Sequence, residues 1–480
     1  MDADVIVVGA GPAGAAAAKY TAAAGLSVLL LDRAEFPRDK ICGDFVGPRA
    51  LIELARLGVS NRPSFKRTNL IRQAAVYVNG KEILSKGVPA APGAPGFARV
   101  IPRETLDNWL ADEARASGAV ILEDHRLTGF ELREDAIELK VLARGRPTRF
   151  RAGLVIGADG SRSTVARFLV SETSTRRKDQ VLAVRAYFAD VQQVHDRAEL
   201  YFSSESFPGY CWMFPTGGDT ANVGLGMLDQ TLPPKSERLR DTLERLIQRD
   251  PILRQRLGSA RLIGKIVGWP LSTYNPRYPV IGPRMMLVGD AAGLINPLNG
   301  EGIYQALASG GWAADAAIQC ARKGDFSSSA LLPYAQKVKD ELMSDMLVAR
   351  ALMELIRNRN FAPFWLAGLQ VIGKRSMRDP LYGYLFGGIL AGVVSARRAL
   401  TAGMMADTIH EALWSTGLKG LIKAVKNPTR TLRVGLKGSM TLRDIVRQST
   451  ANPASTFHWS LDVMRSLVEL SGDVLRIGPA

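Results

Sequence analysis

The residues Asp4–Gly14, which read DVIVVGAGPAG, decide the fold of this chain. The first five predict a short strand of the kind that is buried in a parallel sheet. An alanine-rich segment then predicts a helix to about Gly25, and Ser27–Leu31 predicts a second strand that ends at Asp32. The sequence therefore begins with a βαβ unit whose first turn is rich in glycine.

The three glycines of this turn, Gly9, Gly11 and Gly14, suit a dinucleotide-binding turn. Glycines there permit the tight turn, the close approach of backbone to a pyrophosphate, and the packing of helix on strand. The helix N-terminus would face the phosphates, and Asp32 would bind a ribose hydroxyl. The motif predicts a dinucleotide site, but it does not distinguish FAD from NAD.

Two later segments extend this prediction. Leu154–Arg162 (LVIGADGSR) and Met286–Ile303 (MLVGDAAGLINPLNGEGI) each begin as a buried strand that ends in Gly and Asp. Such an end lies at the carboxyl edge of a sheet, where ligands bind. A helix is expected from about Gly300, and its N-terminal amides could face a phosphate or a flavin ring. The alternative role for Asp159 or Asp290 is that of a helix N-cap.

Composition narrows the class of protein. With 480 residues and 46% hydrophobic residues, the chain can form two or three folded α/β domains. The 62 Lys and Arg residues exceed the 46 Asp and Glu residues, which gives a formal net charge of +16. This balance favours an anionic partner, such as nucleic acid, a membrane surface or a phosphorylated substrate; the alternative is a solvated basic surface.

The cysteines and histidines predict neither a disulfide scaffold nor a metal site. Cys42, Cys211 and Cys320 are widely spaced and lack a CxxC pair, which fits a reducing, cytoplasmic location. The four histidines show no ligand or triad spacing. Because a strand begins at Asp4, no signal peptide is expected.

The C-terminal part is expected to be helical from about Pro333. Its longest weakly charged run, Leu381–Ser395, is too short for a membrane-spanning helix. In Leu418–Arg447, eight Lys and Arg residues are interleaved with apolar ones against a single acid, Asp444. This pattern favours a helix lying on an anionic membrane, so that the protein is peripheral; the alternative is a solvated helix face. No recognition fold accompanies the charge, so nucleic acid is not the expected partner.

The middle of the chain is rich in predicted strands. Ala75–Leu84 contains the hairpin signal Asn79-Gly80, and Val181–Phe188 and Ala198–Phe202 also read as strands. In Tyr210–Pro215 (YCWMFP) three aromatic residues alternate with other residues, which places their rings on one face of a strand.

Together the three glycine- and aspartate-containing segments resemble the FAD-binding fold of the aromatic-hydroxylase superfamily. The resemblance implies that Asp32 binds the adenosine ribose and Asp290 the ribityl or pyrophosphate region. It also implies that Gly302 and Ile303 lie near the isoalloxazine ring. The residues expected to bind FAD are Gly9, Gly11, Ala13, Gly14, Asp32, Arg33, Gly43, Arg103, Leu127, Asp159, Asp290, Gly302 and Ile303.

Four motifs resemble those of the geranylgeranyl reductase family, over roughly residues 4–330. YCWMFP at Tyr210–Pro215, followed after eight residues by Gly224–Gly226 (GLG), matches (Y/F)xWxFP and GxG with their spacing. Lys40–Gly43 (KICG) matches KxCG, and GDAAGLINPLNGEGI is close to GDAAGxxxPLxGEGI. In RETLD, residue Leu106 departs from the family's RxxFD, which matters little if Arg103 holds FAD and residue 106 only packs.

The resemblance implies an FAD-dependent reductase that saturates double bonds of a polyprenyl chain. Such a chain offers almost no hydrogen-bonding groups, so it must be held by area and shape, at about 0.8 kcal/mol for each buried CH₂. The residues expected to bind it are Tyr210, Trp212, Phe214, Pro215, Gly224 and Gly226. The resemblance places Cys42 near the flavin as a proton donor or pocket residue; the alternative is a buried apolar cysteine.

The expected architecture is a Rossmann-like FAD-binding domain of the α/β class with a mixed-sheet substrate domain. The first would comprise residues 1–74, 98–175 and 270–330, and the second residues 75–97 and 176–269. Residues 331–480 would form a helical C-terminal region. An external electron donor, such as NAD(P)H, ferredoxin or another carrier, is expected because no second dinucleotide motif is found.

Other functions remain open at this level. A flavin monooxygenase or epoxidase could use the same pocket, whereas halogenation is disfavoured because the halogenase motif WxWxIP differs from YCWMFP. An electron-transfer flavoprotein that serves a quinone typically carries an iron–sulfur domain, for which three dispersed cysteines are too few. A non-catalytic lipid-binding protein on a flavin fold is the last alternative.

Overall fold

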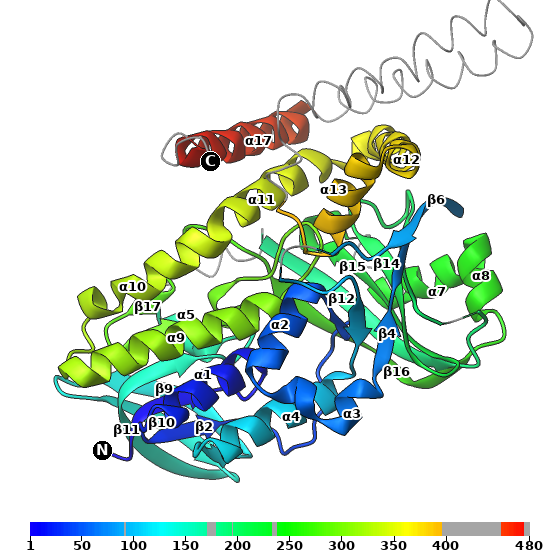
Figure 1. Ribbon diagram of the computed structural model, residues 1–480. Helices are drawn as coiled ribbons and strands as arrows, with labels where there is room; N and C mark the ends of the chain where they lie inside the picture. The colour runs from blue at the N-terminus through cyan, green and yellow to red at the C-terminus, as the bar shows by residue number, and fades with distance from the viewer. Residues whose placement is uncertain (91–92, 170–178, 194, 233–237, 396–452, 475–480) are drawn as a thin grey trace, which may run out of the picture.

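A parallel sheet lies around the first strand of the chain. The computed structural model describes all residues except 91–92, 170–178, 194, 233–237, 396–452 and 475–480 (Figure 1). The first strand, β1 (Ala3–Val8), pairs in parallel with one strand on each side, and its residues Val5–Val7 are fully buried. The chain is therefore a mixed α/β protein, as the sequence predicts.

The larger sheet has eight strands. Beside its main path, β10 (Ile137–Ala143) pairs with the strand β11 and with β9 (His125–Leu132). The path follows the order β17 (Ile281–Gly282), β18 (Met285–Leu287), β11 (Arg146–Gly157), β1, β2 (Val28–Leu31) and β8 (Val120–Leu122). Strands far apart in the sequence thus meet at one carboxyl edge.

A second, seven-stranded sheet contains the aromatic motif. Its β5–β6 turn has positive φ at Asn79 (49°) and Gly80 (70°), which is the hairpin that the sequence predicts. The order is β16 (Arg261–Ser272), β12 (Gln180–Ala189), β15 (Thr220–Leu228), β14 (Tyr210–Gly217), β13 (Arg197–Phe202), β5 (Gln73–Val78) and β6 (Lys81–Gly87). A three-stranded sheet comprises β3 (Phe45–Val46), β7 (Ala98–Val100) and β4 (Asn69–Ile71).

Helices cover the larger sheet and flank the second one. These helices are α1 (Pro12–Ala23), α2 (Pro48–Arg56), α3 (Pro63–Lys66), α4 (Arg103–Ala116), α5 (Thr164–Leu169), α7 (Leu239–Arg249), α8 (Pro251–Leu257) and α9 (Ile303–Lys323). Asp250 ends α7 and caps the helix α8 that starts at Pro251, through hydrogen bonds from the backbone N–H groups of Ile252 and Leu253. Short 3₁₀ turns connect several elements, among them η4 (Gly289–Ala292).

Beyond α9 the described chain is helical. In Figure 1, α12 and α13 lie beside β6, while α17 lies along α11. The bounds are α10 (Ser328–Val338), α11 (Ser344–Ile356), α12 (Ala362–Arg378), α13 (Pro380–Leu390) and α17 (Pro453–Val474), with a π-helical turn at Lys339–Met343. The basic stretch Leu418–Arg447 lies outside the described residues.

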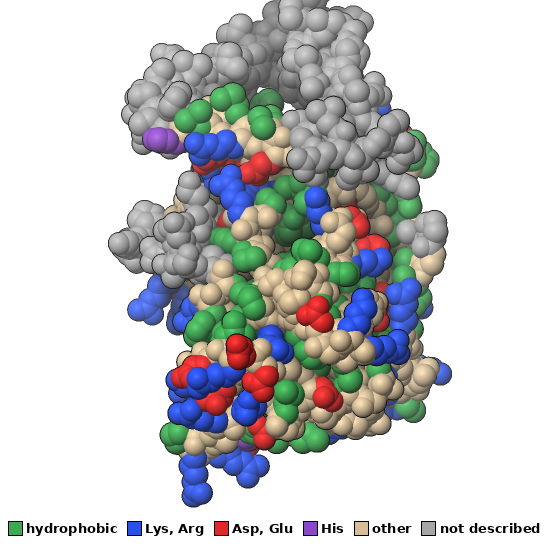
Figure 2. Space-filling model, turned by 90° about the vertical axis from the view of Figure 1, so that its left-hand side faces the viewer, with side chains coloured by type: hydrophobic (Ala, Val, Ile, Leu, Met, Phe, Trp, Pro, Cys, Tyr) green, Lys and Arg blue, Asp and Glu red, His purple; other side chains and the backbone are tan. Residues whose placement is uncertain are grey.

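The surface is mixed in charge, and no membrane-crossing helix is found. On the face in Figure 2, Lys and Arg side chains are interspersed with Asp and Glu side chains, so no uniformly basic patch forms there. Within the described part of the chain, every helix is too short or too polar to cross a membrane.

Helices α1 and α9 cross with their backbones in close contact. A Cβ atom at Gly310 of α9 would lie 2.3 Å from the carbonyl oxygen of Ala13 in α1. The next residue, Gly311, has room, because its Cβ would meet only the Tyr20 ring at 3.5 Å. Backbone contact at this crossing therefore requires glycine at one position but not at its neighbour.

We predict opposite effects for the same substitution at these neighbouring positions. Gly310→Ala should lower the free energy of unfolding by about 1–3 kcal/mol, because overpacking forces the two helices apart. Gly311→Ala should leave it unchanged or raise it by about 0.5–1 kcal/mol, since alanine favours helix. Urea unfolding of both variants tests this, and equal stability of the two would contradict it.

Candidate active site

A groove with a volume of about 890 Å³ follows the carboxyl edge of the larger sheet. It is lined by backbone of the glycine-rich turn, by the end of β2 and by the loop that follows β11. The residues predicted to bind the cofactor that line it are Gly9, Gly11, Asp32, Arg33, Leu127 and Asp159. The fold thus brings three segments that are distant in the sequence together at this groove, as the dinucleotide motif implies.

Close backbone packing shapes the floor of this groove. Gly9 has a φ of 101°, and its Cβ would lie 2.4 Å from the Ala158 carbonyl oxygen. A Cβ at Gly14 would lie 1.8 Å from the Gly9 carbonyl oxygen. Ala13 and Gly14 line no part of the groove, and they instead hold α1 against β1 and α9.

The N-terminus of α1 opens into the groove beside two cations. Its N-cap residue, Gly11, makes no side-chain capping bond, and a Cβ there would be 3.9 Å from Nη2 of both Arg38 and Arg103. Free helix amides flanked by guanidinium groups attract anions. The diphosphate of FAD fits this cradle.

The two arginines belong to a buried ionic chain. Asp107 is fully buried and accepts two hydrogen bonds from Arg103, both at 2.7 Å, and one from Arg38 at 3.0 Å. Arg38 also binds Asp32 at 3.1 Å, and Asp32 accepts the N–H of Ala10 at 2.9 Å. Burial acts to lower the pKa of Arg103, but Asp107 outweighs it and the net pKa is raised. Arg103 therefore stays charged.

Asp290 is held in its charged form by Lys40. The Lys40 Nζ lies 3.0 Å from Asp290 Oδ2, and the Ser161 hydroxyl donates to the same oxygen at 3.3 Å. Burial would raise the pKa of Asp290, but Lys40 and Arg103 outweigh it, so that the pKa is lowered. Asp290 thus places a fixed negative charge next to Gly302, the N-cap of α9.

Asp159 bonds the first turn of α5, although Ser163 and not Asp159 stands at the N-cap position of that helix. The Asp159 carboxylate accepts hydrogen bonds from the Ser163 hydroxyl and the Thr164 N–H, each at 2.5 Å, at the start of α5. The carboxylate therefore shapes the groove by ordering the turn before α5. Asp159 and Gly160 both line the groove.

A second cavity, of about 270 Å³ and mostly apolar, joins the groove. The two share Lys40, Ile41 and Trp269 in their walls. The predicted residues that line the second cavity are Cys42, Gly43, Arg103, Tyr210, Trp212, Phe214, Gly226, Asp290, Gly302 and Ile303. The predicted ring-binding and substrate-binding residues therefore meet in one place.

The three aromatic rings of β14 lie on this cavity in a row. Successive ring centroids, Tyr210 to Trp212 and Trp212 to Phe214, are both 6.3 Å apart. The residues between them, Cys211 and Met213, are buried in the core on the other face. The alternation thus separates a ligand-facing side from a core side, as the sequence pattern predicts.

Two motif residues support this wall without lining it. A Cβ at Gly224 would lie 2.2 Å from Cζ2 of Trp212, so this glycine makes room for the indole ring. Pro215 follows Phe214 on β14, and its carbonyl oxygen accepts a hydrogen bond from Asn69 at 2.9 Å. The indole N–H of Trp212 donates to the Asn222 side chain at 3.0 Å, which fixes the ring orientation.

Cys42 is a protonated thiol at the edge of the cavity. The backbone N–H of Asp44 donates to its sulfur at 3.3 Å. Burial raises the pKa of Cys42, and the nearby cations Arg103 and Lys40 do not offset it. The setting therefore favours a thiol that gives up a proton rather than a thiolate nucleophile.

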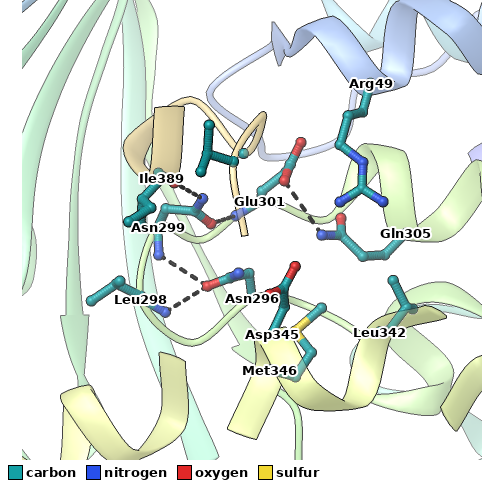
Figure 3. A pocket seen from close by; sticks show the side chains of 12 residues that line it. Arg49, Asn296, Leu298, Asn299, Glu301, Gln305, Leu342, Asp345, Met346 and Ile389 are labelled. Atoms are coloured by element: carbon teal, nitrogen blue, oxygen red, sulfur yellow. Dashed lines mark hydrogen bonds between the residues drawn. The ribbon is translucent and has the colours of Figure 1, made fainter. Parts of the chain in front are cut away.

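A carboxyl group that the sequence did not single out lies next to this cavity. Glu301 lines both the apolar cavity and a small polar cavity of about 20 Å³ (Figure 3). The Gln305 amide donates to Glu301 Oε2 at 3.4 Å. Burial raises the pKa of Glu301 to about 7, although Arg49 acts to lower it. Its position inside the matched GEG segment was the available signal.

We predict that Glu301 makes stability depend on pH. Its folded pKa of about 7 exceeds the ordinary value of 4.5, so its contribution is complete below pH 4.5 and is lost as pH rises to about 7. The scale is about 1.4 kcal/mol for each pH unit between the two values. Glu301→Gln should therefore gain stability relative to the natural protein between pH 5 and 7.5 in urea unfolding.

The matched control for this prediction is Glu244→Gln. Glu244 lies on α7 with its side chain 47% exposed. Its stability difference from the natural protein should stay constant over the same pH range. A constant difference for Glu301→Gln as well would show that this carboxyl titrates normally.

Several proteins of known function are similar to this chain in sequence. Residues 2–339 match the FAD binding domain family. A menaquinone reductase of Mycolicibacterium smegmatis is 33% identical over 392 residues, which cover 78% of this chain and 88% of that protein. Digeranylgeranylglycerophospholipid reductase 1 of Methanothermobacter thermautotrophicus is 32% identical, over 71% of this chain and 83% of that protein.

A solved structure has the same fold. It is a geranylgeranyl bacteriochlorophyll reductase-like protein from Thermoplasma acidophilum, with a TM-score of 0.65 and 24% identity. The match covers 88% of this chain and 98% of that one. These findings confirm the cofactor and the family that the motifs predict. The chain belongs to the geranylgeranyl reductase family of FAD-dependent oxidoreductases.

Proposed function

We propose that this protein reduces carbon–carbon double bonds in the isoprenoid chain of a membrane lipid, with a menaquinone-type side chain as the first candidate. The observation that carries the proposal is the apolar cavity walled by the three rings of β14, which opens beside Gly302 and Ile303. An isoprenoid binds through buried apolar area, and flat aromatic walls provide it. The relatives named for reduction of a quinone and of an isoprenoid phospholipid point to the same substrate class.

In this proposal, some residues bind the cofactor and the substrate, and Cys42 supplies a proton. Bound FAD, once reduced, supplies a hydride to one alkene carbon. The α1 N-terminus, Arg38 and Arg103 would hold its diphosphate, and Lys40 with Asp290 would fix the region near the ring. Cys42 would give its thiol proton to the other alkene carbon. The aromatic wall would orient the chain and exclude water.

The proposal includes an external two-electron donor and a membrane. A reduced nicotinamide or a low-potential carrier protein would restore the reduced cofactor after each turnover. Three apolar side chains of α12 and α13, Phe364, Met377 and Leu381, are at least half exposed. Together with the basic stretch Leu418–Arg447, they suit an anionic lipid surface from which the substrate would enter.

The first test uses the reduced holoprotein without oxygen. It is mixed with menaquinone or with digeranylgeranylglycerophospholipid, each in anionic or in neutral vesicles, and products are weighed by mass spectrometry. We expect a gain of two hydrogens for each reduced double bond, faster with anionic vesicles. No gain with either lipid, but a gain of one oxygen atom in air with reductant, would replace the proposal by a monooxygenase.

Two glycine variants should distinguish an effect on substrate binding from an effect on the stability of the fold. Gly226 lines the cavity, and a Cβ there would meet Val181 and Trp212 at 3.7 and 3.8 Å, which are ordinary contacts. Gly226→Ala should keep its stability and raise KM about fourfold, the equivalent of one lost CH₂ contact. Gly224→Ala should instead lower stability by about 1–3 kcal/mol, because it displaces Trp212. Steady-state kinetics and urea unfolding distinguish the two, and a Gly226→Ala variant with unchanged KM would argue against this cavity as the substrate site.

A further inference from the structure

The indole of Trp269 lies where the polar groove meets the apolar cavity, and the proposed reaction leaves it without a role. Trp269 stands on β16, which is the last strand at one end of the second sheet, and its side chain is only partly buried. Two residues on, Leu271 lines the apolar cavity, whereas Gln180 of the adjoining strand β12 lines the groove. The wall of the groove therefore offers a flat aromatic surface to a ligand.

Two guanidinium groups lie over this indole. The Cζ atom of Arg162 is 4.8 Å from the ring centroid of Trp269, and the Cζ atom of Arg33 is 5.6 Å from it. Arg162 belongs to the loop after β11 and Arg33 follows β2, so two distant segments converge on a residue of a third. The Ser272 hydroxyl of β16 donates to the Ser161 carbonyl oxygen of that loop at 3.2 Å. The fold therefore holds the loop and the indole together.

Neither of these guanidinium groups is paired with another group of the described chain. Arg33 and Arg162 donate no hydrogen bond and form no ion pair to any described residue, and Arg126 of β9, which also lines the groove, is in the same state. All three side chains are exposed. By contrast, Arg38 and Lys40 are both committed to acids. The groove thus carries cations beyond those assigned to the diphosphate of FAD.

The acids that line the groove do not neutralise these cations. Asp39 accepts hydrogen bonds from Arg185, and Asp159 accepts them from the first turn of α5. Asp32 accepts hydrogen bonds from Arg38 and from the backbone of the glycine-rich turn. Because each acid is already engaged, the unpaired arginines leave a net positive charge on this wall. Such a charge attracts an anion that enters the groove.

A nucleotide with a diphosphate fits this wall. Guanidinium groups bind phosphate oxygens in a bidentate manner, and an indole stacks on a flat heterocycle. The groove volume of about 890 Å³ is at the upper end of the range that accommodates one drug-sized ligand, so the adenosine diphosphate half of FAD need not fill it. Because Trp269 also lines the apolar cavity, a ligand on it is next to the space in which the ring of FAD is expected. A carrier protein would contact only the rim of the groove and leave the indole without a partner.

We propose that a reduced nicotinamide dinucleotide, NADH or NADPH, binds on Trp269 with its diphosphate held by Arg33 and Arg162, and that it is the external electron donor. The inference rests on the proposed function. In each turnover a C–H bond at C4 of the nicotinamide breaks, and the hydride carries both electrons to oxidised FAD before the lipid is reduced. One dinucleotide and one proton from water are consumed for each double bond that is saturated, and the oxidised dinucleotide leaves.

Two variants and a matched control test this site in the holoprotein. Arg162→Met removes the charge but keeps an unbranched side chain, and Trp269→Leu removes the aromatic surface. Arg261→Met is the control, because Arg261 lies on the same strand as Trp269 with its side chain 70% exposed, about 26 Å away along the strand. All proteins are loaded with FAD, and the affinity of each for FAD is measured first.

The first readout is the bleaching of the flavin's visible absorbance when NADH or NADPH is mixed with the oxidised holoprotein, without oxygen or lipid. We expect the rate to saturate with the concentration of at least one of the two. Arg162→Met should raise the Kd of that dinucleotide about tenfold, through the loss of one charge-assisted hydrogen bond, and make it less dependent on salt. Trp269→Leu should raise the Kd by about 5- to 100-fold, through the loss of one stacking contact. Arg261→Met should leave it unchanged.

A second readout needs no reaction. Calorimetric titration of the oxidised holoprotein with NAD⁺ and with NADP⁺ should show the same weakening in Arg162→Met and Trp269→Leu, and none in Arg261→Met. Unchanged binding in the first two variants would overturn the inference. A loss of FAD affinity in parallel with dinucleotide affinity would also overturn it, because the wall would then belong to the FAD site.

The outcomes also separate this inference from the proposed function. Bleaching by neither dinucleotide, in a protein that still saturates a lipid after reduction with dithionite, would overturn the inference alone. Bleaching by a reduced plant-type ferredoxin but by neither dinucleotide would make a carrier protein the donor instead. Bleaching by a dinucleotide, in a protein that reduces neither lipid, would support the inference and overturn the proposed function.

Discussion

The structure depends on backbone contact between α1, β1 and α9, where no side chain fits. Gly14 touches the Gly9 carbonyl, and Gly310 touches the Ala13 carbonyl. These contacts bring the N-termini of α1 and α9 to the same edge of the larger sheet. If the N-terminus of α1 holds the diphosphate of FAD and the N-terminus of α9 its ring, as proposed, the fold sets the distance between them.

Electrostatic preorganisation follows from the same arrangement. Arg38 and Arg103 are held by Asp107, and Lys40 is held by Asp290, before any ligand binds. Cations that are already fixed lose little side-chain entropy when an anion arrives. The acids that hold them also limit the excess of positive charge in the groove. Trp269 and Ile41 line both the polar groove and the apolar cavity, where the two meet.

Local pattern allowed most of the fold to be predicted. The glycine-rich turn, the Asn79-Gly80 hairpin and the alternating rings of β14 each depend on neighbours in sequence, and all are found. The part that Asp159 plays in ordering the turn before α5, and that of Gly224 in making room for Trp212, could not be chosen beforehand, because each depends on packing that only the folded structure sets. Asp44, Asn222 and Glu301 were missed for the same reason: burial, which a single sequence does not display, gives them their chemistry.

Burial also explains why substrate affinity and proton supply are linked in this site. An isoprenoid offers the protein nothing but apolar area, so its cavity must exclude water. Exclusion of water leaves the substrate without a proton source, and the protein must then hold protons in its own groups. Burial raises the pKa of Cys42, Asp44 and Glu301, so that each binds its proton more tightly than it would in water. In the proposed function, a wall that binds the alkene well would therefore also hold the proton that its reduction requires.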